Sequence, residues 1–175
     1  TVTYTTSAAT AAKLPFDPLA DLAPISLIAN SPTILVVPTS LPVNSLAELI
    51  AHLKARPGVL NYASYGAGSG PHLAAELFRS LTGVDIVHVP YSGGGPASVG
   101  LMGNNVQMLF SSVLPVLGLV RGGQVKAIAI ASDRRLPLLP DVPTFKESGL
   151  DYRTGTWFGL LAPSKTPDGV VATLH

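Results

Sequence analysis

The sequence predicts an α/β fold with a mostly parallel sheet flanked by helices. Sixteen prolines and seventeen glycines divide the 175 residues into short segments. These segments alternate between apolar, β-branched runs and stretches with helical periodicity, which is typical of βαβ units. Residues 61–95 show this order most clearly, because a strand, a glycine-rich loop, a helix, a strand and a second glycine-rich loop follow one another there.

The chain begins its regular structure with two predicted strands and a helix. Residues 25–28 and 33–37 are apolar and bounded by turn-forming residues, so each reads as a buried strand. Ser45 and Glu48 have capping-box spacing, and apolar residues follow at helical intervals until Pro57. We therefore expect a helix between Ser45 and Pro57.

The central segment continues with a short strand at residues 62–64 and a loop at 65–70 that carries three glycines. Pro71 suits the first turn of a helix, where its missing N–H is not needed, and Gly83 ends that helix. Its periodicity places four apolar residues on one face: Leu73, Leu77, Phe78 and Leu81.

The remaining elements alternate in type. Thr144 and Glu147 offer a second capping-box spacing, from which we expect a helix that Gly149 ends. The other predicted elements are strands at 86–89, 106–110, 125–131 and 156–161, and helices at 96–101 and 113–120.

Several stretches beyond the central segment match one family in order. They are residues 13–18 (KLPFDP), 110–112 (FSS), 123–131 (GQVKAIAIA), 139–144 (LPDVPT) and 157–163 (WFGLLAP). Together with the tyrosine-alanine-serine, glycine-loop, histidine-leucine run of the central segment, they resemble the extracytoplasmic solute receptors of tripartite tricarboxylate transporters, the Bug family.

The resemblance implies a lobe of the type II periplasmic-binding-protein kind. Residues 1–30 would be a remnant of lobe 1 with the first hinge crossing, and residues 31–156 would form lobe 2, the ligand-binding domain. Residues 157–175 would contain the second crossing and the start of the returning lobe 1 segment. The first half of lobe 1, with the family's other ligand-facing glycine loop, would be missing.

The resemblance also implies a non-enzymatic, hinge-bending receptor in the periplasm. Such a receptor captures a small organic carboxylate, whether a dicarboxylate, a tricarboxylate or an aromatic acid, and delivers it to a membrane permease. The signal peptide that family members carry is not present in this chain, so the periplasmic location is an expectation from the family.

Candidate ligand-binding residues follow three predicted strands that would end at one edge of a parallel sheet. Backbone N–H groups at a helix start attract anions, so we expect the amides of Gly68, Ser69 and Gly70, with the Ser69 hydroxyl, to receive a carboxylate. The complete candidate set is Ser64, Tyr65, Gly66, Gly68, Ser69, Gly70, His72, Tyr91, Ser111 and Ser112.

Each candidate has a purely structural alternative. The glycine loop also fits a tight turn without ligand, Tyr91 fits a rim aromatic packed on its neighbour, and packing is the favoured role for His72. Many relatives have an aspartate and an asparagine where this chain has Ser111 and Ser112. Two neutral serines there indicate a ligand without an ammonium group.

Other functions find little support in the sequence. The formal net charge is +1 and the basic residues are dispersed, so nucleic acid is not an expected partner. The loop lacks both the lysine of a P-loop and the dinucleotide fingerprint, and the four histidines lack metal-ligand spacing, so no cofactor or metal is expected. Two alternatives stay open: a small α/β enzyme that uses the loop as an oxyanion or phosphate site, and an orphan lobe that dimerises.

Overall fold

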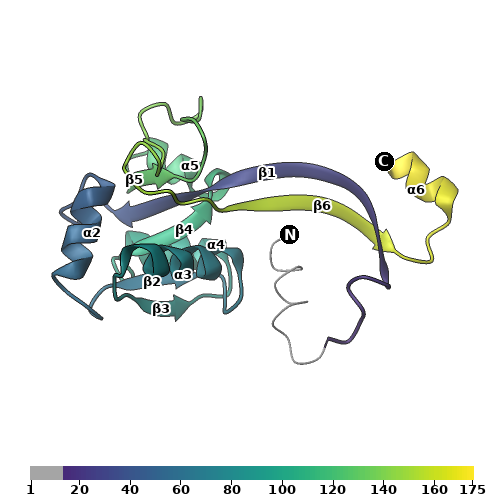
Figure 1. Cartoon of the computed structure of the whole chain (residues 1–175), viewed down its shortest axis with the longest axis horizontal. Helices are drawn as coiled ribbons and strands as arrows, with labels where there is room; N and C mark the ends of the chain where they lie inside the picture. The colour runs from purple at the N-terminus through teal and green to yellow at the C-terminus, as the bar shows by residue number, and fades with distance from the viewer. Residues whose placement is uncertain (1–13) are drawn as a thin grey trace. The chain divides into compact units, whose positions relative to one another are not determined.

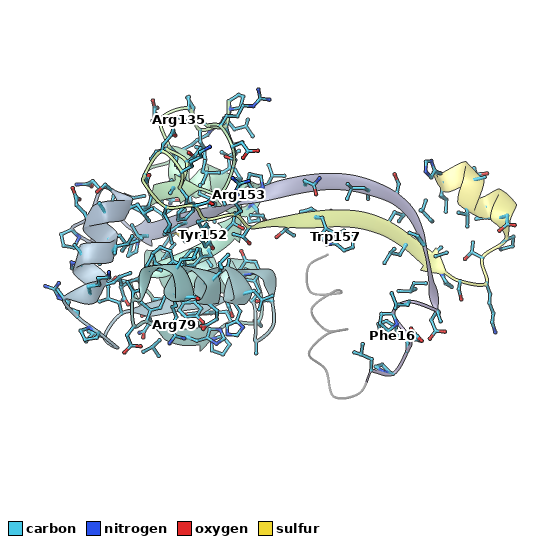
Figure 2. The ribbon with its side chains drawn as sticks, in the orientation of Figure 1. Phe16, Arg79, Arg135, Tyr152, Arg153 and Trp157 are labelled. Carbon is cyan, nitrogen blue, oxygen red and sulfur yellow. The ribbon has the colours of Figure 1, made fainter. Side chains whose placement is uncertain are left out.

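The computed structural model describes residues 14–175, which fall into two compact units. Unit 1 contains residues 14–31 and Thr156–His175, and unit 2 contains Pro32–Gly155. In unit 1, the first part of β1 (Leu22–Pro38) pairs with β6 (Gly155–Pro163), and α6 (Asp168–Leu174) follows (Figure 1). Trp157 of β6 (Figure 2) lies over Gly159, where an added Cβ would be 2.9 Å from the indole Cζ3.

The two strands predicted at residues 25–28 and 33–37 are one continuous strand, β1. Asn30 and Pro32 do not end it. Pairing of β1 with β4 begins only at Thr33, so Pro32 removes no hydrogen bond from that ladder. The assignment of residues 31–156 to lobe 2 and of the outer segments to lobe 1 of a longer receptor stays a prediction.

Unit 2 is built on a mixed sheet with the strand order β3-β2-β4-β1-β5. Its further strands are β2 (Asn61–Ser64), β3 (Val87–Pro90), β4 (Met108–Ser112) and β5 (Val125–Ile130). β2 runs parallel to β3 and β4, whereas β1 is antiparallel to β4 and β5. The α/β class is confirmed, and the parallel ladders between these strands are β2–β3 and β2–β4.

Helices cover both faces of this sheet. Against one face, α2 (Leu46–Lys54) and α3 (Gly70–Thr82) enclose a core that includes Phe78 and Phe110. Against the other, α4 (Gly94–Met102) and α5 (Val113–Arg121) enclose a core that includes Leu101 and Leu109. The alternation of successive strand residues between the two cores gives unit 2 three layers.

The outer surface of α3 is more apolar than its predicted pattern suggested. Of the four residues grouped on one face, only Phe78 is buried, while Leu73, Leu77 and Leu81 are 38%, 36% and 47% exposed. The other buried residues of this helix are small: Ala74 and Ala75, which belong to the same core as Phe78. The helix is therefore rotated so that Phe78 lies at one margin of the predicted face.

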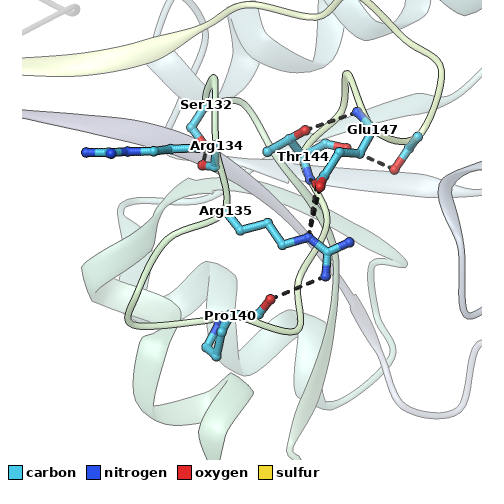
Figure 3. Close-up of polar contacts among 7 residues, drawn as sticks. Ser132, Arg134, Arg135, Pro140, Thr144 and Glu147 are labelled. Carbon is cyan, nitrogen blue, oxygen red and sulfur yellow. Dashed lines mark hydrogen bonds and ion pairs between the residues drawn. The ribbon is translucent and has the colours of Figure 1, made fainter.

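The second capping box forms, but no helix follows it. The Thr144 amide donates to Glu147 Oε2 at 2.7 Å, and the Glu147 amide donates to Thr144 Oγ1 at 3.0 Å (Figure 3). The chain then makes a single hydrogen-bonded turn that Gly149 ends in the left-handed region, with φ 86°. The predicted helix is wrong because Tyr152, three residues later, is drawn into the core against Phe145 and donates to the Ala74 carbonyl.

The topology gathers strand ends at one edge of the sheet. Since β4 and β5 are both antiparallel to β1, they run in the same direction as β2 and β3. We call the edge where β2, β3, β4 and β5 end the carboxyl edge. The chain leaves β2 into α3 on one face and leaves β4 into α5 on the other. Adjacent strands whose connections diverge in this way create the crevice in which α/β proteins bind ligands.

Among residues 14–175, no helix combines the length and the apolar character that crossing a bilayer requires.

Candidate ligand-binding site

Tyr65 joins the ends of three strands at the carboxyl edge. It follows β2 directly, and its hydroxyl lies 2.7 Å from Ser111 Oγ at the end of β4. Its ring lies over Gly94, the first residue of α4 after β3, where an added Cβ would be 3.3 Å from Tyr65 Cζ. Burial raises the pKa of Tyr65, partly offset by the Ser111 hydrogen bond, so the phenol stays neutral. A side chain at Gly94 would push this ring away.

The loop from Tyr65 to Ser69 is held by hydrogen bonds of its own. Gly66 donates its amide to Ser64 Oγ at 3.1 Å, and the Gly66 carbonyl accepts from the Ser69 hydroxyl at 2.6 Å and the Ser69 amide at 3.2 Å. Gly66 and Gly68 adopt φ values of 109° and 76°, which strain residues with a side chain. The loop thus has one defined conformation that its glycines permit.

These internal bonds correct the expectation of three amides open to a carboxylate. The Gly68 amide donates to His72 Nδ1 at 3.1 Å, and the Ser69 amide and hydroxyl both donate to Gly66. Of the three amides, only that of Gly70 lacks a partner in the described part of the chain. Fewer amides than expected are available to a carboxylate, because the loop satisfies most of its own donors.

Two helices begin at the carboxyl edge behind serines that do not cap them. Ser69 precedes α3 and Ser112 precedes α5, both with extended backbone, and neither side chain accepts from its helix's first turn. Within residues 14–175 the Ser112 hydroxyl makes no hydrogen bond. Thr33 of β1 lies directly opposite Ser112 in the β1–β4 register. Two helix N-termini, whose partial positive charge favours an anion, thus begin at this edge without a side-chain cap from their own serines.

Two candidate side chains are already engaged. Ser111 is only 2% exposed, and its hydroxyl is bonded to Tyr65. Tyr91 packs over Gly100 of α4, where an added Cβ would lie 2.7 Å from Tyr91 Cζ. Tyr91 thus packs as its structural alternative describes, and its ligand role stays a prediction. Of the expected serine pair, only the Ser112 hydroxyl makes no hydrogen bond within residues 14–175. Of the other eight candidates, Ser64 closes β2, Ser112 closes β4, and the remaining six follow β2 at the carboxyl edge.

A stack of three rings beside the loop escaped the sequence analysis. The centroids of His72 and His88 are 4.2 Å apart, and those of His88 and Tyr62 are 5.0 Å apart. His88 Nε2 lies 2.6 Å from Ser64 Oγ. Burial, followed by the nearby His72, lowers the pKa of His88. This stack depends on the parallel register of β2 and β3, which sets Tyr62 beside His88. No local sequence motif predicts it.

The Ser64–His88 contact is the feature that most resembles a nucleophile with its base. Ser64, however, is fully buried, and its hydroxyl also exchanges hydrogen bonds with Gly66. A buried hydroxyl with these partners cannot reach a substrate carbonyl. The contact therefore supports the loop's shape and gives the enzyme alternative no accessible nucleophile.

Comparison with known proteins identifies the family. The family described as tripartite tricarboxylate transporter family receptor matches residues 1–175. BugT from Bordetella pertussis is 38% identical over 163 residues, which cover 93% of this chain and 50% of that protein. The chain thus spans about half the length of the curated relatives it matches.

Solved structures show the same relationship. The structure of R. palustris Rpa4515 with adipate superposes with a TM-score of 0.94 at 35% identity, covering 98% of this chain and 58% of that one. The structure of MatC from Rhodopseudomonas palustris with bound malate gives a TM-score of 0.89 at 35% identity, with 97% and 58% covered. This chain belongs to the receptor family of the tripartite tricarboxylate transporters, as its ordered motifs predicted.

Proposed function

We propose that this chain forms the carboxylate-binding lobe of a periplasmic, hinge-bending receptor. The receptor captures a small organic carboxylate between two lobes and delivers it to a tripartite tricarboxylate-type permease. The observation that carries the proposal is the pair of helix starts at the carboxyl edge, α3 and α5, which leave adjacent strands toward opposite faces without caps from their own serines.

The chemistry of this edge suits a carboxylate. The Gly70 amide and the Ser112 hydroxyl each have a proton to donate, and a hydrogen bond to a charged acceptor contributes about 1.5–3 kcal/mol. The two helix ends add about 0.3–1 kcal/mol each. Together these terms support millimolar to micromolar binding without an arginine or lysine.

The relatives agree with this ligand class. One solved structure contains adipate and another malate, both dicarboxylates. Because this chain covers 58% of each of those proteins, contacts from the rest of a two-lobed receptor would add to the ones described here. The family's role as receptors supports a non-enzymatic, periplasmic protein that hands its ligand to a permease.

Thermal shift and titration calorimetry with adipate and malate test the proposal, with dimethyl adipate as a neutral control of the same shape. A dicarboxylate at 100 times its Kd should add about 2.7 kcal/mol to the free energy of unfolding, whereas the diester should add nothing. Mass spectrometry of the recovered acid should show no chemical change. Equal stabilisation by the diester, or consumption of the acid, would refute the carboxylate receptor.

A further inference from the structure

The ring stack and the anion-facing loop are joined by two hydrogen bonds. His72 Nδ1 accepts the Gly68 amide, and His88 Nε2 lies within hydrogen-bond distance of Ser64 Oγ, which in turn holds the Gly66 amide. Both left-handed glycines of the loop are therefore tied, directly or through Ser64, to an imidazole of the stack.

The bond to Gly68 defines the protonation state of His72. A backbone amide only donates, so Nδ1 must carry a lone pair, and the ring is neutral with its proton on Nε2. Its ring faces His88 of β3 and lies near Tyr62 of β2. Glu76, one turn along α3, accepts from the Tyr62 hydroxyl at 2.6 Å and is paired with Arg79.

We propose that His72 and His88 are positioning residues of the carboxylate site: neutral His72 fixes Gly68, and His88 fixes Ser64, so that the Gly70 amide at the start of α3 keeps its direction. This inference rests on the proposed function. Neither histidine touches the ligand in it. Each acts through the loop.

The inference predicts the sign of a pH effect. Protonation of His72 replaces the Nδ1 lone pair with an N–H that opposes the Gly68 amide, and it places a charged ring against His88. The loop then loses its anchor, and carboxylate affinity falls as the pH is lowered. A histidine that contacted the carboxylate directly would do the opposite, because an imidazolium attracts an anion.

Two substitutions at His72 separate its acceptor from its ring. His72→Phe keeps an aromatic ring for the stack and removes the acceptor, so adipate affinity at pH 7.5 should fall about fivefold, the value of one hydrogen bond. His72→Asn returns an acceptor without the ring and should restore most of the lost affinity, with a flatter pH profile. His52→Phe, on α2, is the matched control and should bind as the wild type does.

Nuclear magnetic resonance of the unliganded chain tests the same inference without any ligand. The Gly68 amide should be protected from hydrogen exchange at pH 7.5, and the imidazole nitrogens of His72 should show the neutral form with the proton on Nε2. Protection of Gly68 should be absent in His72→Phe.

These two measurements have distinct outcomes. Tighter adipate binding at low pH, or wild-type affinity in His72→Phe, would overturn the positioning role. An unprotected Gly68 amide would overturn it as well, whatever the ligand does. If Gly68 behaves as expected but no carboxylate binds, the loop inference stands and the proposed function fails.

Discussion

The start of α2 and the starts of α3 and α5 all follow a serine, yet the three serines do different things. Ser45 caps α2: its hydroxyl accepts the Glu48 amide at 3.1 Å, and Glu48 in return accepts the Asn44 amide at 2.7 Å. Ser69 and Ser112 have the same extended backbone but leave their helices uncapped. α2 follows the end of β1 at the opposite edge of the sheet, where Pro38 pairs with the first residue of β5.

The difference separates a structural helix end from one that can serve a ligand. At α2 the Ser45 hydroxyl satisfies the Glu48 amide of the first turn, and such a cap contributes about 0.5–2 kcal/mol to stability. At α3 and α5 the sequence supplies the capping residue but the fold does not use it. Helix starts that their own serines do not cap, at the edge where α/β proteins bind ligands, point to binding.

Substitution of Ser112 or Ser45 by aspartate should give the largest difference in adipate affinity between the two edges of the sheet. An aspartate at an N-cap favours the helix but repels a bound carboxylate, and two like charges near 4 Å repel by about 4 kcal/mol at the effective dielectric of a protein surface. Ser112→Asp should therefore weaken adipate binding by about 100-fold or more while the melting temperature holds or rises. Ser45→Asp should leave affinity unchanged, and the two proteins can be compared by calorimetry.

Alanine at the same positions gives a smaller, complementary effect. Ser112→Ala removes one donor to the carboxylate and should lower affinity about tenfold, with stability nearly unchanged because no cap is lost. Ser45→Ala should lower the free energy of unfolding by about 0.5–2 kcal/mol and leave affinity alone. Urea unfolding should thus detect only Ser45→Ala, and titration with adipate should detect only Ser112→Ala. The comparison fails if both variants lose stability equally.

Removal of the tyrosine hydroxyls tests what holds the carboxyl edge together. Tyr65→Phe leaves the buried Ser111 hydroxyl without its partner and should cost about 1–3 kcal/mol of stability, with some loss of affinity. Tyr91 packs on α4, so Tyr91→Phe should change adipate affinity little. A large affinity loss in Tyr91→Phe alone would restore that residue to the site.

The capping box without a helix provides the next test. Thr144→Ala removes the acceptor of the Glu147 amide at 3.0 Å and should lower stability by about 1 kcal/mol, as at a helix cap, although only a turn follows. Carboxylate affinity should not change. Urea unfolding measures the first effect and titration the second, and an unchanged midpoint would mean that the turn is held by Arg135, which also binds Glu147.

The smallest expected effect is a pH dependence of stability from the ring stack. The pKa of His88 is lowered in the folded chain by burial and by His72, so the unfolded chain binds the proton first. Stability is therefore complete above about pH 6.5, the usual histidine value, and declines as the pH falls below it. Thermal unfolding of His88→Gln between pH 5 and 8 should show a flatter profile than that of the wild type, and parallel profiles would contradict the assignment.

Local sequence signals found most elements and the region of the site. Proline and glycine positions bounded the helices, the capping box at Ser45 started α2 as predicted, and the ordered motifs identified the family. Signals failed where distant packing decides. The box at Thr144 closed without a helix because Tyr152 is drawn into the core. Pro32 did not end β1, and the β1–β4 ladder begins only after it, at Thr33.

The sequence by itself determined the α/β class, the family and the glycine loop, since these depend on periodicity and on residues close together along the chain. Only the tertiary structure decided which donors stay open. Strand register brings together three pairs that are distant in sequence: Tyr65 and Ser111, His88 and Ser64, and Thr33 and Ser112. The last pair is 112 − 33 = 79 residues apart. A hydrogen bond is satisfied by whatever partner the fold places within about 3 Å, and that partner cannot be read from the neighbouring residues.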